Sequence, residues 1–153
     1  MHKHPYVVAF LGMLLGSAAV LAQSPPVEQA LARTHQDAGL TWAPCPEGFP
    51  MGCAIAVLHG DPAKDNADLL FRVPAGARIP AHWHTSAERM VLLSGEMEVA
   101  YEGQQATTLK PGTYAYGPAK RTHKAHCTGD VPCVLFIAFE SPVDAVLVDG
   151  AAK

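Results

Sequence analysis

Two histidines and a glutamate stand close together in PAGARIPAHWHTSAERMVLLSG, residues 74–95. One residue separates His82 from His84, and Glu88 follows four residues after His84. Alternate side chains of a strand share a face, and a turn through residues 85–87 would bring Glu88 back toward the two histidines. Neutral imidazoles bind Zn, Cu, Fe and Ni, and a carboxylate adds negative charge that suits Mn and Fe. The spacing makes these three side chains candidate ligands of one divalent metal ion.

A surface arrangement is the alternative interpretation of the same residues. Two exposed histidines would then flank a glutamate that pairs with Arg78 or Arg89, and His-x-His alone is a weak pattern. Glu88 begins an apolar run, however, where a charged carboxylate is costly to bury unless a cation or hydrogen-bond donors surround it. The metal interpretation gives this carboxylate such a partner.

The segments around these residues read as short strands separated by turns. CAIAVLHG, LLFRV, ERMVLLSG and CVLFIAFESPVDAV are apolar runs bounded by Gly, Pro, Asp or Asn. In EMEVAYEG, Met97, Val99 and Tyr101 alternate with Glu96 and Glu98, which is the period of a half-buried strand. Short strands at this spacing, with turn residues between them, predict an all-β sandwich or barrel.

The glycines that flank the candidate ligands extend the pattern. Gly76 lies six residues before His82, and Gly95 lies seven residues after Glu88. The order Gly, five residues, His-x-His, three residues, Glu, six residues, Gly resembles the first motif of the cupin family without a gap. The chain most resembles small, exported, single-domain cupins. This resemblance implies a single conical β-barrel, also called a double-stranded β-helix or jelly roll, with a metal ion held inside it.

A second motif of that family is recognisable in PGTYAYGPAKRTHKAHC. Gly112 is followed after five residues by Pro118, and after four more by His123. The resemblance makes His123 the fourth ligand, and His126 is its competitor, although it would face the opposite side of a strand. Lys120 stands where the family usually has glycine, so the usual turn is not expected there. The implied ligand set is His82, His84, Glu88 and His123.

Side chains near the ligands are expected to shape an apolar pocket. By parity with the glutamate, Met90 and Leu92 face the barrel interior, and Phe136 and Phe139, on opposite strand faces, are expected to add to the same wall. Tyr114 and Tyr116 alternate on a strand beside the second motif. One of them is expected to face the pocket and to hydrogen-bond a ligand; the alternative is that both are core aromatics.

The four cysteines form two close pairs. Cys45 and Cys53 bracket PEGFPMG, and Cys127 and Cys133 bracket TGDVP, and both loops contain Gly and Pro. Disulfides are expected for both pairs, because an exported chain meets oxidising conditions. A metal site built on cysteine is the alternative, but neither pair has the C-x-x-C spacing of zinc sites.

The first residues resemble a secretory signal peptide. A short polar start is followed by an apolar run, and Val20 and Ala22 fit the −3 and −1 positions of a cleavage site. A retained membrane anchor is the alternative, although the run is short for a bilayer span. The predicted organisation is a signal peptide at 1–22, a short helical arm and the first disulfide loop at 23–50, the barrel at 51–142 and a C-terminal tail at 143–153.

Charge and motif content narrow the functional classes. The net charge of −3 would become −4 after cleavage, because Lys3 is the only charged residue in 1–22. A mildly acidic chain is not expected to bind nucleic acid or an anionic membrane. No Gly-rich phosphate loop or serine–histidine arrangement is evident, so nucleotide cofactors and hydrolase triads are not expected.

The expected function is therefore that of an exported, periplasmic or secreted, metal-binding protein. A metalloenzyme that acts on a small organic molecule, with dioxygenase-like chemistry, is the leading hypothesis. A non-catalytic ligand-binding, metal-binding or sensor protein is the alternative. The cofactor is one divalent ion, with Fe, Mn and Zn left open. Val91 and Leu93 would face away from the barrel interior, which is compatible with a homodimer or with a strand buried on both sides within one subunit.

Overall fold

The computed structural model describes residues 27–148, and the predicted signal peptide lies outside them. Every regular element among these residues is a β-strand, so the predicted all-β class is confirmed. None of the described residues belongs to a helix long and apolar enough to cross a bilayer. The part of the chain from residue 32 onward forms one compact unit, and it contains all of these strands.

The described residues form eleven strands. Their bounds are β1 (Trp42–Pro44), β2 (Ala54–His59), β3 (Ala67–Val73), β4 (Arg78–Trp83), β5 (Glu88–Ser94), β6 (Met97–Tyr101), β7 (Thr107–Leu109), β8 (Tyr114–Gly117), β9 (His123–Cys127), β10 (Cys133–Phe139) and β11 (Val146–Leu147).

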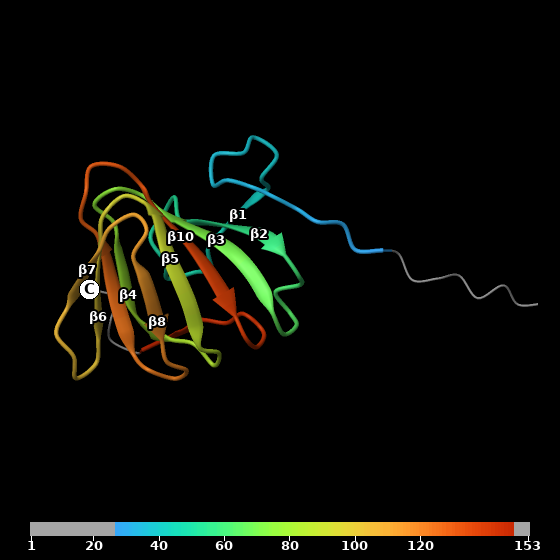
Figure 1. The fold of residues 1–153 in the computed structure, drawn as a ribbon. Helices are drawn as coiled ribbons and strands as arrows, with labels where there is room; N and C mark the ends of the chain where they lie inside the picture. Colours follow the sequence, from blue (N-terminus) through green and yellow to red (C-terminus); the bar gives the residue numbers. More distant parts are fainter. Residues whose placement is uncertain (1–26, 149–153) are drawn as a thin grey trace, which may run out of the picture. The chain divides into compact units, whose positions relative to one another are not determined.

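Two antiparallel sheets are built from these strands, as Figure 1 shows. The six-stranded sheet has the order β1-β2-β3-β10-β5-β8, and the five-stranded sheet has the order β11-β4-β9-β6-β7. Strands far apart in the sequence lie side by side, for example β3 with β10 and β4 with β9. This interleaving is that of a jelly roll, and it brings the two histidine-bearing segments together.

The hydrophobic core lies between the two sheets. Strand β5 directs Glu88, Met90 and Leu92 inward, and its neighbour β10 directs Ile137 and Phe139 into the same space. Side chains alternate between the two faces of each strand, so the residues between these ones face outward. The inner faces of both sheets together form one cluster of buried hydrophobic residues, which surrounds the candidate ligands.

An irregularity in β4 sets the direction of the first ligand. Ile79 and His82 are both buried, although one has an odd and the other an even number. The register of β4 against β9 shifts between these two residues, and Pro80 lies within the shift. Because proline has no N–H to donate to the ladder, it is found at such irregular positions. The parity rule therefore predicts the direction of His82 only when counting starts after this shift.

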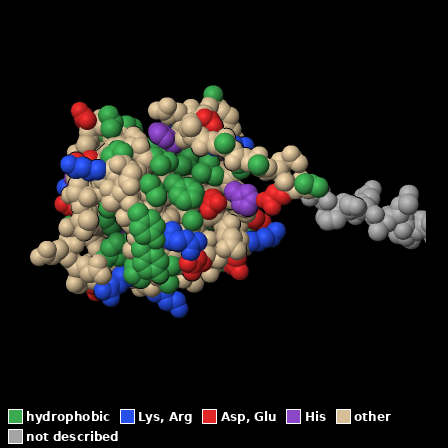
Figure 2. Space-filling model, in the orientation of Figure 1, with side chains coloured by type: hydrophobic (Ala, Val, Ile, Leu, Met, Phe, Trp, Pro, Cys, Tyr) green, Lys and Arg blue, Asp and Glu red, His purple; other side chains and the backbone are tan. Residues whose placement is uncertain are grey.

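A second apolar cluster covers the outer face of the six-stranded sheet. Leu40 and Trp42, which precede and begin β1, pack in this cluster with Leu93 and Phe136. The guanidinium of Arg72 lies 4.1 Å from the centre of the Trp42 ring, as in a cation–π contact. Leu93 is thus covered within the subunit. Figure 2 shows further hydrophobic side chains exposed on the side where β5 and β8 lie, with charged groups between them.

Residues 27–36 contain no helix, so the predicted helical arm is wrong. A turn lies at the end of this segment instead, where the Thr34 hydroxyl bonds to the Asp37 carboxylate at 2.6 Å. The Asp37 amide in turn donates to the Thr34 carbonyl at 3.3 Å. Helices shorter than about 12–15 residues are marginal in water without tertiary packing, and this segment is too short to fold alone as a helix.

The sheets extend beyond the predicted barrel limits of 51–142. Strand β1 pairs with β2 upstream of this range, and β11 pairs with β4 downstream of it. The predicted C-terminal tail therefore begins with residues that complete the five-stranded sheet. Because β4 carries His82, this pairing places β11 beside the candidate ligands.

Both predicted disulfides are present. Cys45 and Cys53 have their Cα atoms 5.5 Å apart, and those of Cys127 and Cys133 lie 5.8 Å apart. The second bridge is fully buried. The first closes a loop that carries Phe49, whose ring contacts the ring of His82 with centroids 5.2 Å apart. This loop thereby forms one wall of the candidate site.

Candidate metal centre

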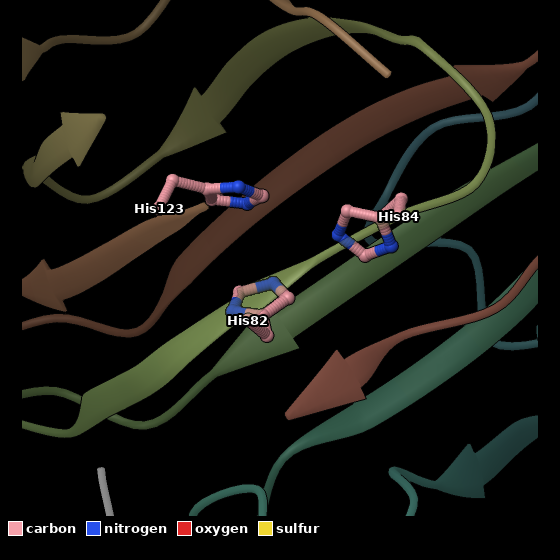
Figure 3. Close-up of side chains that lie close together, drawn as sticks. All are labelled: His82, His84 and His123. Atoms are coloured by element: carbon pink, nitrogen blue, oxygen red, sulfur yellow. The ribbon is translucent and has the colours of Figure 1, made fainter. Parts of the chain in front are cut away.

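Three imidazole rings meet between the two sheets, as Figure 3 shows. His82 lies in β4, His84 follows the end of that strand, and His123 begins β9 directly opposite His82. One ring nitrogen from each residue lies within 4.8 Å of the others, and all three side chains are buried. Three imidazole nitrogens this close together are a donor set that could hold one metal ion.

Each imidazole is oriented by a backbone carbonyl. A carbonyl only accepts hydrogen bonds, so the Nδ1 atom that contacts it carries the proton and Nε2 keeps its lone pair. Metal-binding histidines are commonly fixed in this way. The acceptors are Pro80 for His82 at 2.8 Å, Asp144 for His84, and Arg121 for His123 at 3.1 Å.

Glu88 completes the cluster from β5. One carboxyl oxygen lies 3.3 Å from Nε2 of His84, and the other lies 3.6 Å from Nε2 of His123. The residue is 4% exposed, and burial raises its pKa to about 8. Without a cation, the carboxyl is therefore neutral at pH 7, and its contacts with the two rings are contacts between neutral groups.

The imidazoles are held in the neutral, metal-binding form. Burial lowers the pKa of His82 to about 3, with a further decrease from His123 and opposition from the Pro80 carbonyl. Burial likewise lowers the pKa of His123 to about 4. The pKa of His84 is also lowered by burial, against the effects of the Asp144 carbonyl and carboxylate. Three neutral nitrogen donors are thus present over the whole physiological pH range.

The donor set fits a divalent metal ion. Nε2 of His84 is buried and has no hydrogen-bond partner among the described residues, which is costly unless something binds it. A cation between three imidazoles and one carboxyl would satisfy this nitrogen and favour the ionised form of Glu88. Structural zinc sites are usually closed and often use cysteine, whereas every cysteine of the described residues is in a disulfide.

The backbone around Lys120 supports the cluster. Lys120 has a φ of 59°, the left-handed conformation that glycine adopts most easily, so the turn forms although the residue is lysine. Its amide donates to the carbonyl of His84 at 2.7 Å. The expectation that the usual turn is absent here is therefore wrong.

The C-terminal segment fixes His84 from the other side. The Asp144 carboxylate accepts hydrogen bonds from the Thr85 amide at 2.8 Å and from the Thr85 hydroxyl at 2.5 Å. The carbonyl of the same aspartate accepts from Nδ1 of His84. Asp144 thus clamps the turn that connects the His-x-His segment to Glu88.

Replacing Asp144 with alanine is expected to weaken metal binding about 10–100-fold, the range for loss of an outer partner of a ligand. The substitution removes the carboxylate that holds Thr85, so the carbonyl that orients His84 loses its anchor. Metal titration of the purified variant would measure the change. Asp130→Ala, in the exposed turn of the second disulfide loop, is the control. Equal affinities in the two variants would show that the clamp does not position His84.

The cavity beside the cluster has predominantly apolar walls and a volume of about 130 Å³. Met90 lines it, as the sequence predicts. Leu92 faces the same core but does not line the cavity. Phe136 is not part of the wall, because it packs in the outer cluster, and Phe139 from the opposite face of β10 lines the cavity instead.

Tyr114 and Tyr116 do not reach the cavity, so that prediction is wrong. They are 61% and 52% exposed on the outer side of β8. Ala115 and Gly117, which alternate with the two tyrosines, face inward, because they pair with Met90 and Glu88 of β5. The sequence predicts the alternation of this strand correctly, but the two tyrosines lie on its outer face and not on its inner face. His126 also faces outward, beside Glu98 on the neighbouring strand.

The tyrosine of the cavity is Tyr101, which the sequence analysis placed on an alternating strand without giving it a role. It lies opposite His123 in the pairing of β6 with β9, and the two ring centroids are 4.8 Å apart. Its hydroxyl is buried and has no hydrogen-bond partner among the described residues. Burial and the nearby Glu88 carboxyl raise its pKa, so the phenol keeps its proton as a donor.

Gly117 is required by the close approach of these groups. A Cβ at this position would lie 2.6 Å from the Tyr101 hydroxyl and 2.9 Å from a Glu88 carboxyl oxygen. Gly117→Ala is expected to lower the free energy of unfolding by about 1–3 kcal/mol, the usual cost of overpacking. It should also weaken metal binding, because Glu88 must move.

Denaturant unfolding and metal titration would measure both effects of Gly117→Ala. Gly129→Ala is the matched control, since its nearest contact would be 3.6 Å. If the two alanine variants behave alike, the space above Gly117 is not needed by the site.

Three contributors to the site were missed in the sequence. Asp144 and Phe49 lie 60 residues after and 35 residues before His84, and nothing local marks them as neighbours of the cluster. Tyr101 had a usable signal. It shares parity with Met97 and Val99 in a half-buried strand, so it belongs to the inner face once Met97 is assigned to the core.

Comparisons with known proteins agree with this geometry. Residues 69–139 match the family model described as Cupin domain. The structure resembles the DMSP lyase DddQ from Ruegeria pomeroyi DSS-3, with a TM-score of 0.63 and 25% identity over 74% of this chain and 64% of that chain. This chain thus spans slightly less than two thirds of that lyase. A search of curated proteins found no match.

Two further structures share the fold at lower identity. The cupin-2 domain protein Rru_A2000 from Rhodospirillum rubrum has a TM-score of 0.64 and 15% identity, over 81% of this chain and 85% of that chain. The polyketide cyclase RemF from Streptomyces resistomycificus has a TM-score of 0.65 and 16% identity, over 78% and 86%.

The jelly roll with a buried histidine cluster between its sheets defines the class of protein. The chain contains a cupin domain, as its two sequence motifs predict.

Proposed function

We propose that this protein is an exported, metal-dependent cupin enzyme that acts on a small organic molecule, with dioxygenase-like chemistry. The observation that carries the proposal is the position of the histidine–glutamate cluster in the wall of an apolar cavity. Ligand sites are typically apolar clefts with a few convergent polar groups, and perturbed pKa values cluster at such sites.

His82, His84, His123 and Glu88 would hold the ion. It would supply Lewis acidity and, if it is redox-active, a place for oxygen to react. The protein's own contribution is to orient the donors through the backbone carbonyls and to exclude water with the surrounding apolar wall. Tyr101 keeps a buried, unpartnered hydroxyl that can donate a hydrogen bond to a bound molecule.

Export is part of the proposal. It is supported by the signal-like pattern at residues 1–22 and by the two disulfides, because disulfides persist in oxidising compartments. Loading after export would expose the site to Zn, Cu and Mn as well as Fe. The native metal is therefore to be measured on protein recovered from the exported fraction.

Elemental analysis followed by an activity screen tests the proposal. The protein would be purified with its native metal and incubated with a broad set of small organic compounds, while oxygen uptake and product formation are followed. Oxygen uptake that tracks the metal content would support the dioxygenase-like activity. Product formation without oxygen uptake would instead support a lyase or isomerase activity. Such chemistry is closer to that of the DMSP lyase that this protein resembles.

A binding protein is the second candidate. The buried cluster of three rings could hold one ion whether or not turnover follows. Tight and selective binding of metal or ligand, with no product from any compound in the screen, would favour this function over catalysis.

A further inference from the structure

We infer that the molecule bound in this cavity is small and largely hydrocarbon, with one metal-binding head group that carries at most one negative charge. The inference rests on the proposed function and narrows its substrate class. It depends on three properties of the cavity, which are the chemistry of its walls, its charge and its volume.

The walls offer contact to hydrocarbon and almost no polar partners. Leu69, Ile79, Val99, Leu135 and Ile137 are among the aliphatic residues that line the cavity. Apart from the four candidate ligands, the lining contains two polar side chains, those of Tyr101 and Asp144. The carboxylate of Asp144 is already bound by the amide and the hydroxyl of Thr85. The Tyr101 hydroxyl is therefore the one free side-chain donor that remains for a head group.

The charge of the cavity limits the charge of the ligand. No Lys or Arg occurs among the described residues that line it, and the two carboxylates there are those of Glu88 and Asp144. Asp144 keeps its negative charge, which hydrogen bonds from the amide and the hydroxyl of Thr85 stabilise. A divalent ion bound by an ionised Glu88 and three neutral imidazoles has a net charge of +1. One negative charge on the head group balances it, whereas a second would be buried without a partner, which is costly.

The volume limits the size of the ligand. The cavity measures about 130 Å³. An engineered cavity of about 150 Å³ in another protein stays dry and binds benzene, which has six non-hydrogen atoms. A buried part of about six non-hydrogen atoms, head group included, would therefore fill the space. Sugars, nucleotides and extended dicarboxylates are too large or too polar.

The pairing of β5 with β10 shows which residues lie beyond the ligands. Phe139 pairs with Glu88, and Ile137 pairs with Met90 one step deeper along the barrel. Two residues along a strand correspond to about 6.8 Å. A hydrocarbon chain that starts at the metal centre and runs into the barrel therefore meets Met90 and Ile137.

A series of alkyl hydroxamates tests the inference directly. The hydroxamate group binds metals through two oxygens and carries one negative charge, so it reproduces the expected head group. The cobalt(II)-substituted protein would be titrated with aceto-, butano-, hexano- and octanohydroxamate, and binding would be followed by the visible spectrum of the bound cobalt. Succinic monohydroxamate is the matched charged probe, because it replaces the distal methyl of butanohydroxamate with a carboxylate.

The expected result is about fourfold tighter binding for each methylene that the cavity accepts, ending when the chain is too long. Succinic monohydroxamate should bind at least about 100-fold more weakly than butanohydroxamate, because its second charge is buried unpaired. Ile137→Ala should move the preferred chain to a longer member of the series. Phe136→Ala, on the outer face of the same strand, should leave the preference unchanged.

Two outcomes would overturn the inference while the proposed function stands. They are an affinity that does not depend on chain length, and equal binding of butanohydroxamate and succinic monohydroxamate, in each case with cobalt still bound at one equivalent after gel filtration. Failure of the protein to bind cobalt at all would instead remove the proposed function, and this inference with it. Thermal unfolding of Ile137→Ala and Phe136→Ala would show whether an altered preference reflects the cavity or a loss of fold.

Discussion

Replacing His82 and His123 together with alanine is expected to reduce bound metal from about one equivalent per chain to less than about 0.1. These two rings lie directly opposite each other in the pairing of β4 with β9, with centroids 4.2 Å apart. Their loss leaves one imidazole and one carboxyl, too few to hold a divalent ion against water. The affinity should fall by at least about 1,000-fold, more than the 10–100-fold expected when an outer partner of a ligand is lost.

Elemental analysis of the unchanged protein and of the double variant, purified in the same way, would measure this loss. His126→Ala is the matched control, since it removes a histidine from the same strand on the opposite face. Its metal content should equal that of the unchanged protein. Metal retained by the double variant would show that ions bind elsewhere, and metal lost from His126→Ala would show that the loss follows damage to β9.

The proximity of the four candidate ligands could be predicted because their arrangement is largely local. His82, His84 and Glu88 lie within one strand–turn–strand segment, and His123 is separated from them by a second motif of fixed spacing. Even so, strand parity alone does not explain the result. The register shift at Pro80 changes which residues of β4 face inward.

The cavity could be predicted less well, because its walls come from distant parts of the chain. Alternation of Tyr114, Ala115, Tyr116 and Gly117 specifies two faces but not which face is the inner one. The inner one follows from crowding. Only residues without bulk fit beside Glu88 and Tyr101, as the close contacts of a Cβ at position 117 show. Small residues that alternate with aromatics are therefore a signal for a crowded interior, which the larger residues avoid.

No local sequence pattern predicts that Asp144 clamps the turn at Thr85. Asp144 reaches the site because β11 pairs with β4, a contact between residues more than 60 positions apart. The same is true of Phe49, whose loop is closed by the Cys45–Cys53 disulfide. Long-range pairing decides such neighbours, and a pattern read along the sequence does not contain it.

Metal affinity is expected to rise about tenfold per pH unit between pH 6 and pH 8, and then to level off. In the metal-free protein burial raises the pKa of Glu88 to about 8, so the carboxyl is protonated below this pH. A divalent ion binds the carboxylate, and binding must therefore release one proton. The imidazoles do not contribute in this range, because burial lowers the pKa of His82 to about 3 and that of His123 to about 4, and also lowers that of His84.

The free energy of unfolding of the metal-free protein should also depend on pH, through the same buried carboxyl and imidazoles. Folding raises the pKa of Glu88. The stability that this shift contributes is present below the unfolded-state pKa of 4.5, and it is lost as the pH rises through the folded-state pKa of about 8. The lowered pKa values of the imidazoles have the opposite effect, since stability is lost as the pH falls below 6.5. Unfolded chain takes up three protons on these rings and releases one from the carboxyl. The free energy of unfolding should therefore be largest near pH 6.5.

Glu88→Gln separates the carboxyl from every other source of pH dependence. The amide is close in shape to the neutral carboxyl but does not titrate, so metal affinity in this variant should be weak and nearly constant from pH 6 to pH 8.5. Titration with Mn²⁺ or Co²⁺, which hydrolyse little in this range, would measure both proteins. A flat profile in the unchanged protein would mean that Glu88 is already ionised without metal. A tenfold slope that persists in Glu88→Gln would assign the released proton to another group, of which Tyr101 is the nearest in the cavity.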